Sequence, residues 1–506
     1  MKKKLLSMIL TAVFATTSLT AFGAPVFADD EEDYDEINIS WLTTMTLDHA
    51  ATDPIVEAIN AITEPEAGVH VNIVFYDPGT YATQIPMEIQ ANEKLDLLMY
   101  TPIPGSGFQS FYRQGQLLNI REYLEEDGQD ALEAVGDLIE GTTGADGGIY
   151  GVPSNRTLGS TLYAIMRTDV LEELGLKEKA ENMTSWTEFE EILKEVVEKT
   201  DYAGIGNSDV NGSVLAVSPY YTGDDSFANN RGFDSLGDTN YLIASDGEGH
   251  AESYFGSENY RKEVERAQKW YDEGLIYKDA AVSQEYNINL MKTGAVFSVL
   301  SAAELGGEEI SESTCGFDLT YTKIADSVCG TDATHKFGFA VPICSTDPEA
   351  AVRFLNLLYT NSDINNLLGW GLEGRDWVEK DGEADYPDGV TSDNVVYHMS
   401  DYLGNQFITL PWAGSGADFR EVQKAYQDEL VYSPYMGFVA DTDEITNEVT
   451  ACFGIIEQYR KQLASGSSGD WEKNLDEMNS KLEAAGIDKV VECYQTQLDA
   501  WLAAQE

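Results

Sequence analysis

The sequence predicts an α/β protein whose first domain is built on a parallel β-sheet. Short apolar segments alternate with helix-like segments along residues 37–100, at the spacing of βαβ units. The chain has 506 residues, and at about 100–200 residues per domain this length allows two or three domains with large cores. The hydrophobic fraction of 43% is too high for a disordered chain, even at a formal charge of −57.

The expected elements of the first domain are, in order, a strand over 37–42, a helix over 53–62 with Asp53 as its cap and Pro54 at its first position, a strand over 69–75, a helix over 82–92 and a strand over 95–100. Ligands of parallel sheets bind beyond the carboxyl ends of the strands. Trp41 and the loop of residues 100–108 lie at two such ends, so they are candidate binding residues.

The rest of the chain continues to mix strands and helices. The expected elements are a strand over 161–166, a helix over 168–174, a helix over 186–199 opened by a capping box of Ser185 and Glu188, a helix over 260–271, strands over 294–300 and 337–343, and a helix over 350–359 capped by Asp347. Residues 201–245 are rich in Gly, Asn, Asp, Ser and Tyr and predict long loops. The last hundred residues predict helices with a break at Gly486.

The N-terminal segment predicts export. Lys2, Lys3 and Lys4 precede an uncharged, mostly apolar stretch, and Val26-Phe27-Ala28 offers a small-residue cleavage site. We therefore expect residues 1–28 to be a signal peptide. Residues 29–36 (DDEEDYDE) are nearly all acidic and predict a solvated leader of the mature chain.

The charge balance excludes two classes of partner. The chain carries 88 Asp and Glu against 31 Lys and Arg, so its surface repels phosphates. Nucleic acid and anionic lipid headgroups are therefore not expected to bind.

Catalytic motifs do not stand out from the sequence. Walker, GxSxG and HExxH patterns are missing. Residues 369–374 (GWGLEG) match the letters GxGxxG, but an expected helix precedes them, so we interpret them as a turn and not as a nucleotide site. Glycoside hydrolysis needs a pair of carboxylates, but a chain with 88 acidic residues always contains such pairs, so their presence does not indicate catalysis. A secreted glycan-acting enzyme is therefore the less favoured alternative.

Cysteine and histidine spacing indicates neither a metal nor an organic cofactor. The five histidines are scattered singly, and the five cysteines match no zinc or redox pattern. Cys315 and Cys329 could close a short loop in an oxidising compartment, but buried thiols are the favoured interpretation.

The tryptophans divide into two groups. Trp186, Trp270 and Trp501 recur with other apolar residues at helical spacing and predict core packing. The second group lies at strand ends or in Gly-rich turns and consists of Trp41, Trp370, Trp377 and Trp412. Flat rings suit the C–H face of a sugar, and Asn, Asp and Arg can bond its hydroxyl groups. The second group therefore indicates carbohydrate binding.

Several longer segments resemble a known family. They are residues 347–359 (DPEAAVRFLNLLY), 371–376 (GLEGRD), 433–438 (SPYMGF), 484–489 (AAGIDK) and 495–501 (QTQLDAW). Together with the expected βαβ lobe and the turn at 149–153 (IYGVP), they are similar to the extracellular solute-binding proteins of ABC transporters, family 1. That group binds carbohydrates, and the match is closest to the subgroup related to the lipoprotein LplA.

The resemblance implies a periplasmic-binding-protein-like α/β fold, with two lobes of mostly parallel sheets, an interlobe ligand cleft and a helical C-terminal region. It places lobe one at 37–153 plus 335–362, and lobe two at 154–334 plus 363–506. The residues it implies for ligand binding are Trp41, Phe108, Asn155, Arg156, Tyr220, Tyr221, Ser301, Trp370, Trp377, Asn405 and Trp412.

The function implied is that of a monomeric, exported component of an ABC importer. It is expected to capture a carbohydrate, specifically an oligosaccharide, by hinge closure and to deliver it to permease subunits. A peptide or a polyamine on the same scaffold is the alternative ligand, because a fold does not decide its ligand. Lipid-anchored members of the family carry a Cys at the cleavage site. This chain has Ala28-Asp29 there, so a lipid anchor is not expected.

Overall fold

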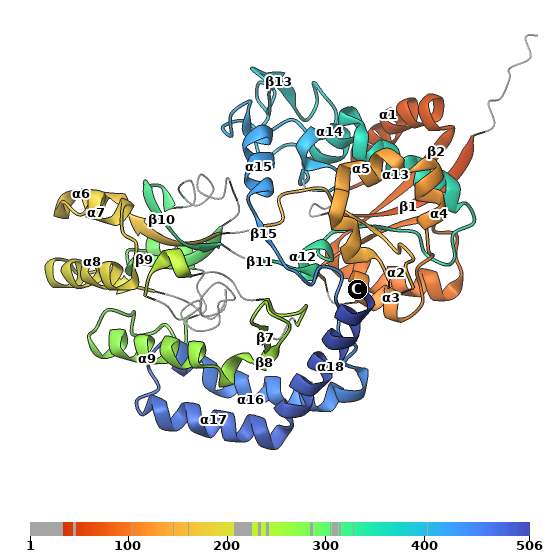
Figure 1. Ribbon diagram of the computed structural model, residues 1–506. Coiled ribbons are helices and arrows are strands. Elements are labelled where there is room, and N and C mark those ends of the chain that lie inside the picture. Colours follow the sequence, from red (N-terminus) through yellow and green to blue (C-terminus); the bar gives the residue numbers. More distant parts are fainter. Residues whose placement is uncertain are drawn as a thin grey trace, which may run out of the picture.

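The computed structural model describes residues 34–43, 47–103, 105–144, 146–159, 161–206, 225–230, 234–238, 242–283, 287–303, 305, 312, 315–326, 328–401 and 403–505. The expected signal peptide, Tyr220 and Tyr221 lie outside these residues. Within them the chain forms two α/β lobes side by side, with a layer of C-terminal helices along one side of both (Figure 1). Asp35 and Glu36, predicted as leader, are the first residues of a strand.

The first lobe is built on a five-stranded sheet in the order β2-β1-β3-β12-β4. Its strands are β1 (Asp35–Leu42), β2 (Val69–Tyr76), β3 (Leu97–Tyr100), β12 (Gly338–Ala340) and β4 (Val152–Pro153). Strand β1 pairs in parallel with β2 and β3, while β12 runs antiparallel to both of its neighbours. The surrounding helices are α1 (His49–Ala67), α2 (Pro78–Ala91), α3 (Phe108–Arg113), α4 (Arg121–Asp127), α5 (Gln129–Val135) and α13 (Pro348–Thr360).

Helix α1 begins earlier than the predicted helix. The Asp48 side chain accepts a hydrogen bond from the Ala51 amide and caps the helix, so Pro54 lies inside it and not at its start. The prediction of Asp53 as the cap is therefore wrong. Proline so near the start removes only one helical hydrogen bond, which the buried face of α1 outweighs.

The second lobe contains a four-stranded sheet in the order β10-β5-β9-β6. Its strands are β5 (Thr161–Arg167), β6 (Ala203–Ile205), β9 (Val296–Ala303) and β10 (Leu319–Asp326). Only the β6–β9 pair is parallel, so the expectation of mostly parallel sheets is wrong for this lobe, where β5 pairs antiparallel with both of its neighbours. The helices of this lobe are α6 (Thr168–Leu174), α7 (Lys177–Glu181), α8 (Trp186–Lys199), α9 (Glu258–Asp272) and α10 (Asn287–Lys292). Ser185 caps α8 by accepting from the Glu188 amide, as predicted. The Glu188 carboxylate accepts from the amide of Thr184, one residue before the cap, so the second bond of the predicted capping box is displaced by one residue.

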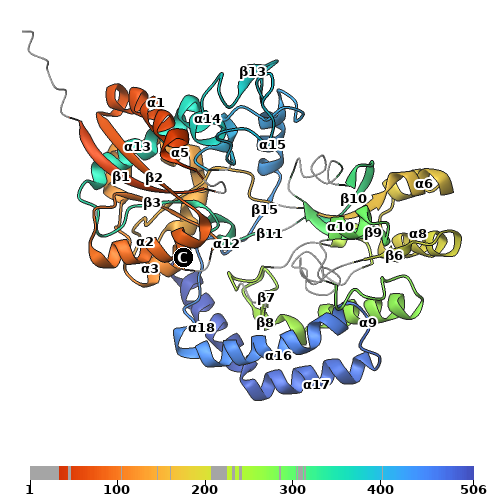
Figure 2. The same ribbon diagram turned by 180° about the vertical axis from the view of Figure 1, so that it is seen from behind.

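Three segments connect the lobes, and Figure 2 shows them from behind. The first crossing segment, residues 154–159, leads from β4 to β5. The second, residues 328–337, contains β11 (Val328–Cys329) and α12 (Thr331–Thr334). The third, residues 429–440, contains β15 (Val431–Tyr432), which pairs in parallel with β11.

Two further groups of elements complete the molecule. One follows α13 and packs beside the first lobe; it consists of α14 (Ser362–Trp370), β13 (Val378–Lys380), β14 (Glu383–Asp385) and α15 (Phe419–Asp428). Ile364, Leu368 and Tyr397 of this region belong to the first lobe's core, so that core extends beyond the predicted boundary at residue 362. Helix α14 causes this by burying its apolar side against α1.

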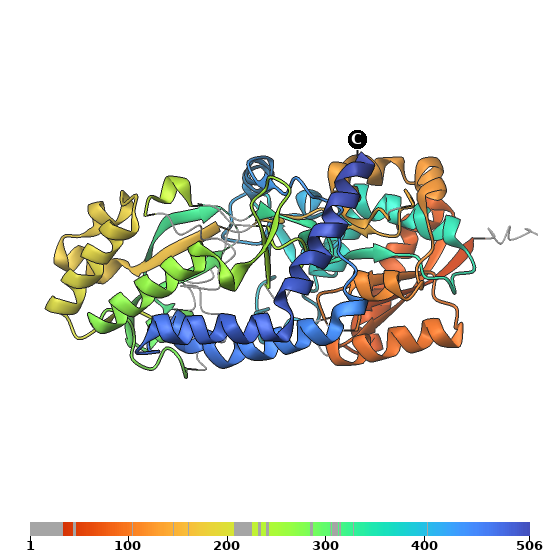
Figure 3. The ribbon, with the colours of Figure 1, turned by 60° about the horizontal axis from the view of Figure 1, so that its bottom comes forward.

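The C-terminal helices are α16 (Thr446–Ala464), α17 (Trp471–Ala485) and α18 (Ile487–Gln505). They run beneath the second lobe with the hairpin of β7 (Ile243–Ser245) and β8 (Ala251–Ser253), and α18 reaches the first lobe (Figure 3). Gly486 ends α17 in the left-handed conformation, as predicted. No helix in the described part of the chain is long and apolar enough to span a membrane.

All five cysteines are free thiols. Four are buried, among them Cys315 and Cys329, and Cys493 is partly exposed. This confirms the interpretation of buried thiols over a disulfide-closed loop.

Candidate functional site

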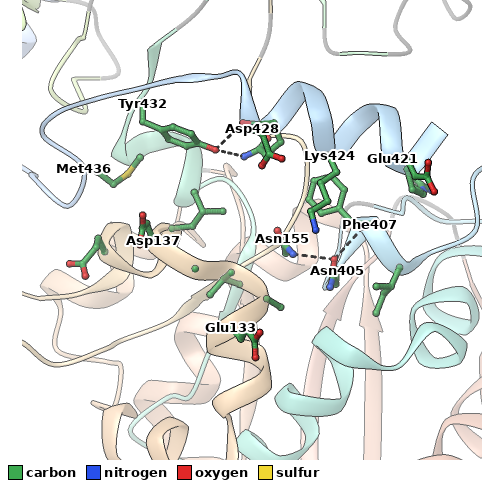
Figure 4. Close-up of a pocket in the computed structure, with 18 of the residues that line it drawn as sticks. Glu133, Asp137, Asn155, Asn405, Phe407, Glu421, Lys424, Asp428, Tyr432 and Met436 are labelled. Carbon is green, nitrogen blue, oxygen red and sulfur yellow. Dashed lines mark hydrogen bonds between the residues drawn. The ribbon is translucent and has the colours of Figure 1, made fainter. Parts of the chain in front are cut away.

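A cavity of about 1000 Å³ lies where the crossing segments meet the first lobe. We call it the junction cavity (Figure 4). Its walls come from α5, the following 3₁₀ turn (Gly136–Thr142), the first crossing segment, residues 405–408, α15 and the third crossing segment. Segments from distant parts of the sequence therefore converge on one space.

Two predicted binding residues meet at this cavity. Asn155 of the first crossing segment donates from Nδ2 to Oδ1 of Asn405 at 3.2 Å, and both residues line the cavity (Figure 4). The Asn405 amide group is fixed by two more bonds, since its Nδ2 donates to the Tyr359 carbonyl at 2.8 Å and its Oδ1 accepts from the Phe407 amide at 3.2 Å. The sequence brings these asparagines together across 250 positions.

The charged residues that line the junction cavity are mainly acidic. Its carboxylates are Glu133, Asp137, Glu140, Glu421 and Asp428, against the two cations Arg420 and Lys424. Arg420 is only 9% exposed and its charge is matched by an ion pair with Asp401. The cavity therefore disfavours an anionic ligand.

A second feature is a group of aromatic side chains from residues 370–412. Trp370, Trp377 and Trp412 gather in one cluster with Tyr386 and His398, which we call the aromatic cluster. The Trp370 and Trp412 ring centroids are 5.0 Å apart, and His398 stacks on Trp370 at 5.1 Å. Trp370 and Trp377 are buried, while Trp412, Tyr386 and His398 are partly exposed. The cluster thus has three partly exposed aromatic side chains over a buried base.

The base of the aromatic cluster is held by the turn after α14. Gly371 has φ +87°, and a Cβ there would lie 2.3 Å from Oδ2 of Asp376, so only glycine fits. The buried Asp376 carboxylate accepts from the Leu372 amide at 2.9 Å and from two nitrogens of Arg375. Gly369 and Trp370 are the last two residues of α14, and residues 371–374 form the turn that follows it, so the segment is not the strand–turn–helix of a nucleotide site.

Hydrogen bonds orient the indole rings of the cluster. Trp370 donates from Nε1 to the Leu410 carbonyl at 3.0 Å, and Trp377 donates to the Gly371 carbonyl at 2.9 Å. Burial among the rings lowers the pKa of His398, so its imidazole is neutral at pH 7. A neutral, fixed set of rings is suited to stacking on a sugar.

The structure places other predicted site residues elsewhere. Trp41 is 0% exposed in the first lobe's core, with its ring 5.3 Å from Phe339. Phe108 is 2% exposed and stacks on His335 in the same core. Neither ring presents a free face, because the end of β1 and the start of α3 turn these side chains into the lobe.

Two further predicted residues lie apart from both features. Arg156 is buried in the first crossing segment, where it donates to the Thr157 carbonyl and lies over the ring of Phe337. Ser301 lies in β9 of the second lobe, opposite Tyr163 of β5, and is partly exposed.

Several residues of these features were not predicted. Tyr386 and His398 complete the aromatic cluster, and Arg420 and Gln427 connect α15 to its surroundings. Tyr386 and His398 lie in irregular chain without periodicity. Arg420 and Gln427 lie on the strongly amphipathic helix α15, whose pattern indicates a helix but not the contacts of these two side chains. Among the described residues, no group of three or more His, Cys, Asp or Glu side chains is placed to hold a metal ion.

Comparisons with known proteins identify two matching regions. Residues 48–363 match the family model described as bacterial extracellular solute-binding protein. Residues 434–503 match a domain of unknown function, DUF3502, which corresponds to the C-terminal helices.

Individual relatives agree with these matches. A carbohydrate ABC transporter substrate-binding protein of Streptococcus pneumoniae serotype 4 is 22% identical over 462 residues, which cover 89% of this chain and 88% of the relative. The crystal structure of the N-glycan transport solute binding protein NgtS from Streptococcus pneumoniae has a TM-score of 0.76 at 20% identity, covering 93% of this chain and 100% of the other. Its complex with Man5GlcNAc has a TM-score of 0.62 at 21% identity, with 93% and 99% covered.

An HMO binding solute-binding protein from Bifidobacterium longum infantis also shares the fold. Its TM-score is 0.66 at 17% identity, covering 92% of this chain and 99% of the other. At these sequence identities, the solved structures are evidence for the fold alone. The fold they share with this chain is the predicted two-lobed architecture.

Proposed function

The chain belongs to the bacterial extracellular solute-binding proteins, and on that premise we propose that it captures an oligosaccharide for an ABC importer. The observation that carries the choice of ligand is the aromatic cluster, in which buried Trp370 supports the partly exposed rings of Tyr386, His398 and Trp412. The relatives described as carbohydrate and N-glycan binders support the same choice.

In this proposal the exposed rings stack on sugar faces, and polar groups at the junction cavity bond hydroxyl groups. Covering about 50–100 Å² of apolar ligand surface with one ring contributes roughly 1–2.5 kcal/mol. Two rings therefore supply a useful share of the approximately 8 kcal/mol of a micromolar complex. The acidic charges that line the junction cavity disfavour anionic sugars.

Lobe closure on the ligand is part of the same proposal. The TM-score is 0.76 with the NgtS structure and 0.62 with its Man5GlcNAc complex, which supports a lobe arrangement here that differs from the one in that complex. The protein is proposed to act as an exported monomer without a lipid anchor, to deliver the sugar to permease subunits and to perform no chemistry on it.

Calorimetric titration of the mature protein tests the proposal. We expect at least one neutral oligosaccharide, with Man5GlcNAc as the first probe, to bind, and spermidine and a mixed peptide library not to bind. Binding of spermidine or peptides with no response to sugars would refute the sugar assignment. Sustained release of reducing sugar from a glycan would refute the proposal of a non-catalytic protein.

A matched pair of variants tests the aromatic cluster. Trp412→Ala should raise the Kd about 5- to 70-fold, from the loss of one stacked ring. Trp471→Ala is the control, because Trp471 is also partly buried but opens α17 in the C-terminal layer. Equal Kd values for the two variants would show that the aromatic cluster is not part of the binding site.

A further inference from the structure

Helix α15 lies between the aromatic cluster and the crossing segments. Its first turn reaches the cluster and its last turn reaches two of the three connections between the lobes. Both ends are attached through buried, hydrogen-bonded side chains.

At the cluster end, one carbonyl group is shared. The Leu410 carbonyl accepts from Nε1 of Trp370 and from Nη2 of Arg420, each at 3.0 Å. Arg420 also donates from Nε to the Thr409 carbonyl at 2.8 Å. The position of the Trp370 indole is thereby tied to the Arg420 guanidinium group.

From Arg420 the bonds continue to the first crossing segment. Arg420 pairs with Asp401, whose other carboxylate oxygen accepts from Nε2 of Gln406 at 3.1 Å. The Oε1 atom of Gln406 accepts from the backbone amide of Thr157 at 3.0 Å. Four side chains therefore form a continuous path from the cluster to the hinge.

At the other end of α15, Gln427 holds two crossing segments together. Its Oε1 accepts from the Leu158 amide at 2.9 Å, and its Nε2 donates to the Tyr432 hydroxyl at 2.8 Å. Leu158 belongs to the first crossing segment and Tyr432 to the third. Gln427 is buried, and its side-chain amide joins these two segments.

We propose that α15 is the coupling element of this protein, with Arg420 and Gln427 as positioning residues that transmit ligand contact at the aromatic cluster to the crossing segments. The proposal rests on the proposed function for the nature of the ligand, but the path itself is a property of the ligand-free chain. A buried network of this kind has few alternative arrangements, so displacing one member moves the next.

Hydrogen exchange of the ligand-free, full-length mature protein tests the path directly. Trp370→Phe removes the indole donor while keeping an aromatic ring, and it should speed exchange in residues 154–159 about three- to tenfold. Trp377→Phe is the matched control, because Trp377 lies in the same cluster but donates to the Gly371 carbonyl outside the path. It should leave residues 154–159 unchanged.

Coupling is reciprocal, so the reverse experiment is required. Gln427→Leu should speed exchange at the Leu410 amide, which is bonded to Oδ1 of Asn366 at 2.9 Å. Lys424→Leu, one turn earlier and exposed, should not. Equal exchange in each variant and its control would overturn the proposal. Should Trp370→Phe fail to fold, Arg420→Lys replaces it, with the same expected result at residues 154–159.

An experiment with added ligand distinguishes a failure of this proposal from a failure of the proposed function. With Man5GlcNAc as the probe, the wild-type radius of gyration should contract on binding, while Gln427→Leu should bind with a smaller contraction. Full contraction of the variant would overturn the coupling. If no sugar of the titration panel binds the wild type, the proposed function fails, whereas the exchange experiments still decide whether α15 couples the two ends.

Discussion

Replacing Glu263 with Gln should stabilise the protein at neutral pH. Glu263 lies in α9 on the face packed against α16 and α17 and is 4% exposed. Its Oε1 has no hydrogen-bond partner within the described part of the chain, and the same holds for the hydroxyl of Tyr260 one turn earlier. Burial raises the pKa of Glu263 well above its usual 4.5, although the charge of Arg266 opposes this shift.

The sign of the effect follows from proton binding. Between pH 4.5 and the raised pKa, the folded protein holds a proton on Glu263 that the unfolded chain has released, so this group makes the free energy of unfolding fall as pH rises. The slope is about 1.4 kcal/mol per pH unit. Glutamine has the same shape and no proton to lose, so Glu263→Gln removes this slope and should gain most over the wild type at the highest pH.

Urea unfolding at pH 5, 6 and 7, followed by circular dichroism, measures the difference between wild type and variant. The difference should grow with pH by up to about 1.4 kcal/mol per unit. Glu265→Gln is the matched control, since Glu265 is exposed on the same helix and should show no such growth. Parallel wild-type and Glu263→Gln curves would refute a neutral, buried Glu263.

Three further predictions concern other parts of the chain. The mature protein should begin at Asp29, and N-terminal sequencing that finds Met1 or a lipidated residue would contradict this. Trp41→Ala should lower the free energy of unfolding by about 3–5 kcal/mol and leave the Kd unchanged. Trp41→Phe should lower it much less, because this change also removes a buried indole N–H that has no partner among the described residues. Equal losses for the two variants in urea unfolding would argue against this account. Asn405→Ala should cost about 1–3 kcal/mol, since it removes the acceptor of the Phe407 amide and the donor to the Tyr359 carbonyl, and an unchanged unfolding midpoint would show that neither bond matters.

Elements fixed by neighbouring residues could be predicted from the sequence. Asp347 caps α13 and Ser185 caps α8 because each bond spans only three residues. The sequence predicts the start of the first helix too far along the chain, because Asp48 and Asp53 both precede apolar residues. Only the folded chain shows that Asp48 is the cap of α1. Local signals thus identify a helix better than they identify its first residue.

The candidate site was harder to predict because it depends on contacts between distant segments. Trp41 and Trp412 both lie next to irregular chain, yet one is enclosed by the sheet of the first lobe and the other stays partly exposed. The residues next to Trp41 and Trp412 in the sequence do not indicate which of the two rings will be buried. The contact of Asn155 with Asn405, and the path through Arg420, likewise follow from the packing of the whole first lobe.

The strand order of the first sheet has a consequence for how the chain folds during synthesis and export. Strand β12 lies between β3 and β4, and its Phe339 pairs with Met99, 240 positions earlier. The sheet of the second lobe, in contrast, is formed entirely within residues 161–326. A chain that emerges from its N-terminus can therefore complete the second sheet first, while β4 waits for β12 to supply its neighbour. The lobe that contains the start of the mature protein is thus the later one to close its sheet, and its exposed strands are the part of the newly made chain most open to mispairing.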